Sequence, residues 1–207
     1  MLIVGAKGFA KELLEVMIQC DATIKISFFD NVSENVEDVL YGKYKVIKFE
    51  KDLPEVFQAD KEFGLGVGGT VIRKKMTDLM IKNGGKLRTV ISPFSHIGHF
   101  NNFIGIGCTI MTGAVITNDI QIGEGTLINL NSTVGHDSKI GAFCDISPGV
   151  HVSGNCTIGN FCALGTGCVI LSHVKLADNV TVGAGAVVNK DVAEGLTVVG
   201  VPAKILK

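Results

Sequence analysis

Residues 104–140 read IGIGCT-IMTGAV-ITNDIQ-IGEGTL-INLNST-VGHDSK-I, and every group of six begins with an aliphatic residue. The same step continues to Val188, so fifteen consecutive positions that lie six residues apart are all Ile, Leu or Val. Glycine often follows the aliphatic residue, and it suits backbone turns that strain other residues. A period of six residues is typical of a parallel β-helix, in which each hexad contributes one short strand and one turn.

The fifth position of each hexad is small or branched, which indicates a second column of inward-facing side chains. Five of the six cysteines fall in this column: Cys108, Cys144, Cys156, Cys162 and Cys168. A buried thiol packs as a small hydrophobic group, and spacings of six lack the CxxC pairs of structural metal sites. We therefore interpret the cysteines as core residues and expect neither a metal nor a disulfide.

Three hexads of this kind form one triangular coil of 18 residues. Residues that lie 18 apart in the sequence are therefore expected to stack on adjacent coils, separated by about 4.8 Å. This rule places Phe143 on Phe161, and it places His136 on Gly154.

The N-terminal part of the chain has a different composition. Of the first 103 residues 27 are charged, against 9 of the 90 residues from 104 to 193. Apolar runs at 2–4, 24–29 and 63–67 alternate with helical patterns, and the segment 87–91 is expected to close the unit. The sequence thus predicts two domains, an α/β Rossmann-like unit over 1–92 and a β-helix with a C-terminal tail over 93–207.

A glycine-containing turn, Gly5 to Gly8, separates the first strand from the first helix. Such a turn presents backbone N–H groups and a helix N-terminus to a phosphate, although a purely structural turn uses the same residues. Asp30 follows Gly8 by 22 residues, near the spacing at which a carboxylate contacts a ribose hydroxyl. About 90 residues cannot hold both halves of a dinucleotide-binding fold. A ligand that contains one nucleotide, such as a nucleotide-activated sugar, is therefore favoured over NAD.

His136 is the third residue of its hexad, so we expect it to project from a corner of the β-helix. Asp137 follows directly and could orient the imidazole, which would then be suited to act as a general base near neutral pH. The local sequence alone also fits a solvated surface histidine beside an aspartate.

Charge and hydropathy exclude several classes of partner. The chain has 207 residues, a formal net charge of −1 and 46% hydrophobic residues. It lacks the excess of basic residues that is typical of a protein that binds nucleic acid or an anionic membrane surface. No apolar run approaches a length of about 18 residues, which a membrane-spanning helix needs. Met1–Lys7 shows no basic leader followed by an apolar segment. We therefore expect a cytoplasmic protein without membrane insertion.

Taken together, the short Rossmann-like unit, the hexads and the closing Val199-Gly-Val-Pro-Ala-Lys204 resemble the NeuD-type sugar O-/N-acyltransferases. This group includes sialic acid O-acetyltransferases and UDP-4-amino-sugar N-acetyltransferases. The resemblance covers essentially the whole chain. It implies a left-handed β-helix, a homotrimer with sites between subunits, and acetyl-CoA as co-substrate in grooves between neighbouring β-helices.

The resemblance also implies roles for individual residues. His136 matches the catalytic base, Asp137 the residue that orients it, and Gly154 a glycine whose backbone N–H faces the thioester carbonyl. The stretches that hold the nucleotide sugar contain Gly5, Gly8, Asp30, Asn31, Gly68 and Asn129. The CoA groove is expected to include Asp145, Gly154, Gly165, Gly183, Pro202 and Lys204.

Two positions depart from the pattern. Relatives commonly carry a second histidine nine residues after the catalytic one, where this chain has Asp145. The first turn is Gly-Ala-Lys-Gly-Phe, where many relatives have Gly-x-Gly-Gly-His. Arg73 matches an arginine at the start of a helix in the family, without an assigned role.

The function expected from the resemblance is acetyl-CoA-dependent N-acetylation of a nucleotide-activated amino sugar of the UDP-4-amino-sugar type, for cell-surface glycan biosynthesis. A sugar or sialic acid O-acetyltransferase would use the same residues. A non-catalytic hexapeptide-repeat scaffold is the alternative from another class, and it would need neither His136-Asp137 nor the C-terminal tail.

Overall fold

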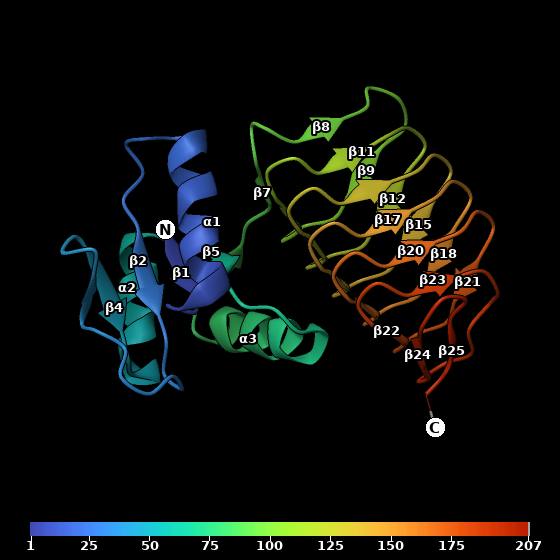
Figure 1. Ribbon diagram of the computed structural model, residues 1–207. Coiled ribbons are helices and arrows are strands. Elements are labelled where there is room, and N and C mark those ends of the chain that lie inside the picture. The colour runs from blue at the N-terminus through green and yellow to red at the C-terminus, as the bar shows by residue number, and fades with distance from the viewer. Residues whose placement is uncertain (207) are drawn as a thin grey trace.

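Each hexad forms a two-residue strand followed by a turn, and the strands wind into a left-handed β-helix (Figure 1). The computed structural model describes residues 1–206. The strands are β7 (Val90–Ile91), β8 (His96–Ile97), β9 (Phe103–Ile104), β10 (Thr109–Ile110), β11 (Val115–Ile116), β12 (Gln121–Ile122), β13 (Leu127–Ile128), β14 (Thr133–Val134), β15 (Lys139–Ile140), β16 (Asp145–Ile146), β17 (His151–Val152), β18 (Thr157–Ile158), β19 (Ala163–Leu164), β20 (Val169–Ile170), β21 (Lys175–Leu176), β22 (Thr181–Val182), β23 (Val187–Val188), β24 (Thr197–Val199) and β25 (Lys204–Ile205).

The strands form the three sheets of a triangular prism. The sheet orders are β25-β24-β22-β19-β16-β13-β10-β7, β23-β20-β17-β14-β11-β8 and β21-β18-β15-β12-β9. Partners are 18 residues apart, as in the pairing of Ile110 with Ile128 and of Ile128 with Ile146. The predicted coil of three hexads is therefore confirmed.

The two inward columns fill the interior. Every first-position aliphatic residue from Ile110 to Val188 is buried. Every fifth-position residue from Cys108 to Val192 is buried as well, the five cysteines included. Burial raises the pKa of Cys108 to about 11 and that of Cys168 to about 12, so these thiols are protonated at neutral pH. The rings of Phe143 and Phe161 stack with centroids 5.8 Å apart, as the 18-residue spacing predicts.

The N-terminal α/β unit is a six-stranded sheet with helices. Its elements are β1 (Leu2–Val4), α1 (Gly8–Cys20), β2 (Ser27–Phe29), β3 (Val39–Leu40), β4 (Tyr44–Ile47), a 3₁₀ helix (Glu50–Asp52), α2 (Leu53–Ala59), β5 (Glu62–Leu65), α3 (Thr70–Lys82) and β6 (Lys86–Leu87). The strand order is β3-β4-β2-β1-β5-β6, parallel except for the β3–β4 pair. None of the helices within residues 1–206 is long and apolar enough to cross a membrane.

The prediction that residues 87–91 close the α/β unit is confirmed for Leu87 but is wrong for residues 90–91. β6 pairs with β5 of the α/β unit, whereas β7 pairs with β10 of the β-helix. The chain leaves the first sheet after Leu87, and the Val90 N–H donates to the Cys108 carbonyl on the next coil. The β-helix thus begins two strands before Ile104.

This first coil contains one additional residue, so the six-residue period in the sequence does not extend into it. The step from Ile91 to Ile97 is six residues, but the step from Ile97 to Ile104 is seven. Asn102 fills the longer corner, because its Oδ1 accepts the Ile120 N–H at 3.0 Å and its Nδ2 donates to two carbonyl oxygens of the adjoining turns. An amide side chain thereby satisfies backbone groups at the irregular corner.

The α/β unit packs on the β-helix sheet that contains β10 and β13. Met111 and Leu127 of the β-helix are buried in the same apolar cluster as Leu13 and Met17 of α1. Figure 1 shows α1 and α3 on the side of the α/β unit that faces the β-helix. The contacts lie on the part of this sheet that runs from β7 to β16.

Candidate active site

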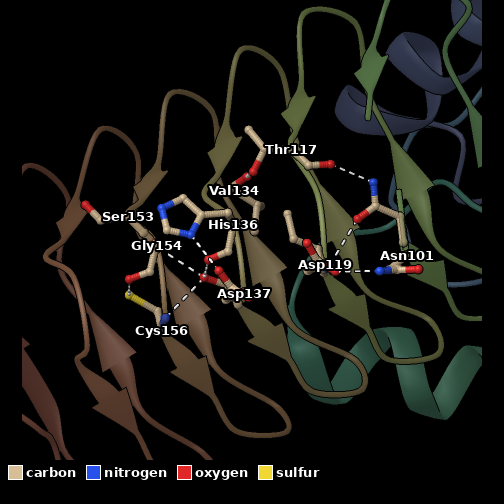
Figure 2. A network of polar contacts seen from close by, with 12 residues as sticks. Asn101, Thr117, Asp119, Val134, His136, Asp137, Ser153, Gly154 and Cys156 are labelled. Atoms are coloured by element: carbon tan, nitrogen blue, oxygen red, sulfur yellow. Dashed lines mark hydrogen bonds and ion pairs between the residues drawn. The ribbon is translucent and has the colours of Figure 1, made fainter. Parts of the chain in front are cut away.

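His136 lies at the corner that follows β14, and its imidazole contacts the next residue in the chain. Nδ1 of His136 is 2.7 Å from Oδ2 of Asp137 (Figure 2). Asp137 has a φ of 59°, in the left-handed region that aspartate tolerates better than most residues. In the tautomer whose Nδ1–H donates a hydrogen bond to the carboxylate, Nε2 carries the free lone pair and can accept a proton.

The pair is open to other molecules. The side chain of His136 is 64% exposed and that of Asp137 is 55% exposed. A general base must reach the group from which it takes a proton, and an imidazole exposed to this degree leaves room for such a group.

Gly154 lies directly beside the imidazole on the adjacent coil, as predicted. A Cβ added to Gly154 would come within 2.6 Å of Nε2 and 2.7 Å of Cε1 of His136, so a side chain there would displace the ring. The flanking amides are bonded, since Ser153 N–H donates to Ile170 O and Asn155 N–H donates to His136 O. Within residues 1–206 the Gly154 N–H has no such acceptor, so it can donate to a developing oxyanion.

Replacing Gly154 with Ala is expected to lower turnover by about 100-fold, because a shift of the imidazole by about 1 Å can cost that much. Ser172 occupies the same corner position one coil further along and is exposed. Ser172→Ala is the matched control and should retain wild-type turnover. Initial rates of the two purified variants, with circular dichroism to check folding, make the comparison. Equal rates would show that a side chain at position 154 does not disturb the His136 imidazole.

A cavity of about 370 Å³ opens at the carboxyl ends of β1, β2 and β5. Ligands of parallel α/β sheets bind at this edge. Five of the predicted nucleotide-sugar residues line this single cavity: Gly5, Gly8, Asp30, Asn31 and Gly68. The structure therefore brings these five residues together, and their role in binding stays a prediction.

Asp30 ties two walls of the cavity together. Its carboxylate accepts N–H groups from Ala6 at 3.1 Å, from Val32 at 3.2 Å and from Ser33 at 2.9 Å. Burial acts to raise the pKa of Asp30, but these hydrogen bonds outweigh it and leave the pKa below the ordinary value. The ionised side chain thus holds the Gly5–Gly8 turn against the loop after β2, a structural role that spacing alone did not indicate.

The remaining predicted residues lie on the β-helix, and none of them is among the residues that line this cavity. Asn129, Gly165 and Gly183 follow β13, β19 and β22, so they line one edge of the prism. His136 follows β14 of the next sheet and therefore lies on a different edge. Pro202 precedes β25, which pairs with β24 at the end of the β-helix opposite β7, and Lys204 is its first residue.

Asp145 occupies a position that its expected role in the CoA groove did not suggest. It lies on β16, and its Oδ2 accepts the Gly69 N–H at 2.7 Å, where α3 begins. The carboxylate is therefore bonded to the α/β unit and is not beside His136. Its partner is 76 residues away in the sequence, and no motif predicts that contact.

Arg73 of α3 is a fully buried charge whose contacts sequence reasoning missed. Nε donates to Gly125 O at 2.8 Å, and Nη1 donates to Val67 O at 2.8 Å and Leu65 O at 3.3 Å. Nη2 donates to Thr109 Oγ1 at 3.3 Å. Burial lowers the pKa of Arg73 to about 10, and the nearby carboxylate on β16 opposes the shift. The protonated guanidinium thus joins the end of β5 to the β-helix.

Comparison with protein families identifies both halves of the chain. Residues 1–80 match the PglD N-terminal domain, and residues 155–190 match the bacterial transferase hexapeptide (six repeats).

Three solved structures are similar over nearly the whole chain. The acetyltransferase domain of PglB from Neisseria gonorrhoeae in complex with acetyl coenzyme A has 32% identity and a TM-score of 0.90, covering 99% of this chain and 98% of that one. WeeI from Acinetobacter baumannii has 31% identity and a TM-score of 0.90, with the same coverage of 99% and 98%. PerB from Caulobacter crescentus in complex with CoA and GDP-perosamine has 27% identity and a TM-score of 0.88, covering 100% and 96%. The chain therefore belongs to the NeuD/PglD-type hexapeptide-repeat sugar acyltransferases.

Proposed function

We propose that the protein transfers the acetyl group of acetyl-CoA to the amino group of a nucleotide-activated amino sugar of the UDP-4-amino-sugar type. The observation that carries the proposal is the pairing of a carboxylate-oriented imidazole with the unbonded Gly154 N–H on the adjacent coil. Acyl transfer needs a base for the nucleophile and a donor for the oxyanion. The complexes of the similar proteins with acetyl-CoA, CoA and GDP-perosamine support the choice of substrates.

In the proposed reaction the acceptor nitrogen attacks the thioester carbonyl carbon. His136 takes the proton from that nitrogen on Nε2, while the Asp137 carboxylate holds Nδ1–H and stabilises the imidazolium. The Gly154 N–H donates to the oxyanion, and one such donor is worth on the order of 3 kcal/mol. The C–S bond then breaks, and the imidazolium returns its proton to the departing CoA sulfur.

The proposed mechanism uses direct transfer, with no acyl intermediate on the cysteines of the β-helix. The five inward thiols are buried in the β-helix, and burial raises the pKa of Cys108 and Cys168 to about 11 and about 12. A protonated thiol inside the prism is a poor nucleophile.

The two substrates are assigned to different domains. We place the nucleotide sugar on residues 1–92, in the 370 Å³ cavity, with Asn129 near the acceptor sugar, and we place CoA on residues 93–207. Gly165, Gly183, Pro202 and Lys204 would line the CoA groove.

A homotrimer would complete the site. The α/β unit packs on the sheet that contains β10 and β13, whereas His136 follows a strand of the next sheet. The edges that carry His136 and Gly165 are also different. A groove between neighbouring β-helices would bring one chain's His136 edge to the other chain's Gly165 edge. Sedimentation equilibrium should therefore give three times the chain mass, and a stable monomer would contradict this assignment.

Thermal shift and product analysis test the proposal. Acetyl-CoA and UDP, each at about 100 times its Kd, should stabilise the protein by about 2.7 kcal/mol and raise the melting temperature by several degrees. Incubation with acetyl-CoA and a panel of UDP- and GDP-amino sugars should give a product with one N-acetyl group by mass spectrometry. Acetylation of a hydroxyl would instead identify an O-acetyltransferase, and no response to either ligand would indicate a scaffold.

A further inference from the structure

Helix α3 connects the two halves of the molecule through its first turns. The Gly69 N–H before the helix donates to Asp145, Arg73 donates to the Gly125 carbonyl, and Lys74 Nζ lies 5.8 Å from the centre of the Phe143 ring. The acceptors and the ring all belong to the β-helix. The start of α3 is therefore held by the domain that carries His136.

The same helix forms part of the wall of the nucleotide cavity. Ile72 and Met76 of α3 line the cavity, and so does Gly68, which precedes the helix. A Cβ added to Gly68 would lie 3.2 Å from Oδ2 of Asp145, so the carboxylate is in contact with the wall itself. A substitution at Asp145 is therefore expected to alter the cavity through Gly68, which adjoins the hydrogen-bond donor Gly69.

Helix α3 lacks a cap of its own. Its N-cap residue is Gly69, which has a φ of 79° and no side chain that could accept an N–H group of the first turn. Asp145 supplies a carboxylate oxygen at this end from another domain, and a negative charge there is favoured by the helix dipole. It is also the carboxylate whose charge acts on buried Arg73.

We infer that Asp145 is a positioning residue that caps α3 from the β-helix and so fixes the wall of the nucleotide cavity relative to the acyl-transfer site. The inference rests on the proposed function, and it goes beyond it by giving Asp145 a part in the placement of the nucleotide sugar. Its effect is on the sugar substrate, because the hydrogen bond ends at the cavity wall and not at His136.

The test compares Asp145→Ala, Asp145→Asn and the control Asp178→Ala. Loss of the cap should raise KM for the nucleotide sugar about tenfold, a size typical of a lost N-cap, with KM for acetyl-CoA unchanged. Asn keeps an oxygen that can accept the Gly69 N–H, so Asp145→Asn should restore most of the sugar KM. Asp178 accepts the Asn160 N–H at 2.8 Å inside the β-helix, so its loss should leave the sugar KM unchanged.

A purely structural role for Asp145 predicts a different result, in which stability falls and both KM values stay at wild-type level. That outcome, or a failure of Asn to restore the sugar KM, would overturn the inference. If the wild-type protein acetylates no amino sugar, the proposed function fails by itself. Amide hydrogen exchange over residues 68–76 then decides the inference: faster exchange in Asp145→Ala than in Asp178→Ala supports the cap, and equal exchange overturns it.

Discussion

Replacing His136 with Ala is expected to lower turnover by about 10²–10⁴-fold, the range for loss of a positioned general base, while the affinity for acetyl-CoA stays near the wild-type value. The imidazole is the group that can take the proton from the attacking nitrogen. Its Nδ1 is already held by the Asp137 carboxylate at 2.7 Å, and the other ring nitrogen, Nε2, lies beside Gly154 on the adjacent coil. The effect therefore falls on the chemical step and not on binding.

Steady-state rates and calorimetric titration of acetyl-CoA measure the two quantities separately. His151→Ala is the matched control, because His151 is an exposed histidine on β17 whose Nδ1 lies 3.0 Å from the Thr133 hydroxyl. It should keep full turnover. Asp137→Asn should give a smaller loss than His136→Ala, since the ring remains but the imidazolium is less stabilised. Unchanged turnover in His136→Ala would remove His136 from the reaction.

Replacing Arg73 with Ala is expected to lower the free energy of unfolding by about 3–5 kcal/mol. The side chain is fully buried and donates to three carbonyl oxygens and one hydroxyl drawn from both halves of the molecule. Alanine leaves these acceptors without their donor and leaves a cavity between α3 and the β-helix. Arg73→Lys should give an intermediate loss, because an ammonium keeps the charge without the planar fork of donors.

Urea denaturation followed by circular dichroism measures the loss. Arg88→Ala is the control: Arg88 pairs with Glu62 at 2.6 Å, but the two side chains are 44% and 41% exposed. A pair exposed to that degree is worth less than about 1 kcal/mol. A loss for Arg73→Ala no larger than that for Arg88→Ala would contradict a central role for Arg73 in joining the two halves.

Much of the candidate site follows from local rules. The hexad period repeats the same inward pattern in every coil, so it predicts strands, core and coil length together. It also predicts that His136 stacks on Gly154, because any two residues 18 apart meet on adjacent coils. The nucleotide cavity follows from a similar rule: Gly5, Asp30 and Gly68 each come after a parallel strand, and the carboxyl ends of such strands meet at one edge.

The start of the β-helix is where the periodic signal failed. The seven-residue step between Ile97 and Ile104 ended the count, and the repair depends on the side chain of Asn102 reaching the Ile120 N–H on the next coil. A search for a six-residue period finds only hexads of regular length. The one extra residue in this step interrupts the period, although the β-helix itself continues.

The β-helix, its buried cysteines, the α/β unit and the corner with His136 could all be predicted from the sequence, because each depends on a repeat or on the alternation of strand and helix along the chain. The way in which the two units dock could not be predicted and is seen only in the structure. Arg73 reaches Gly125 across 52 residues and Gly69 reaches Asp145 across 76. These contacts depend on the orientation of two independently patterned surfaces, and neither pattern carries information about the other.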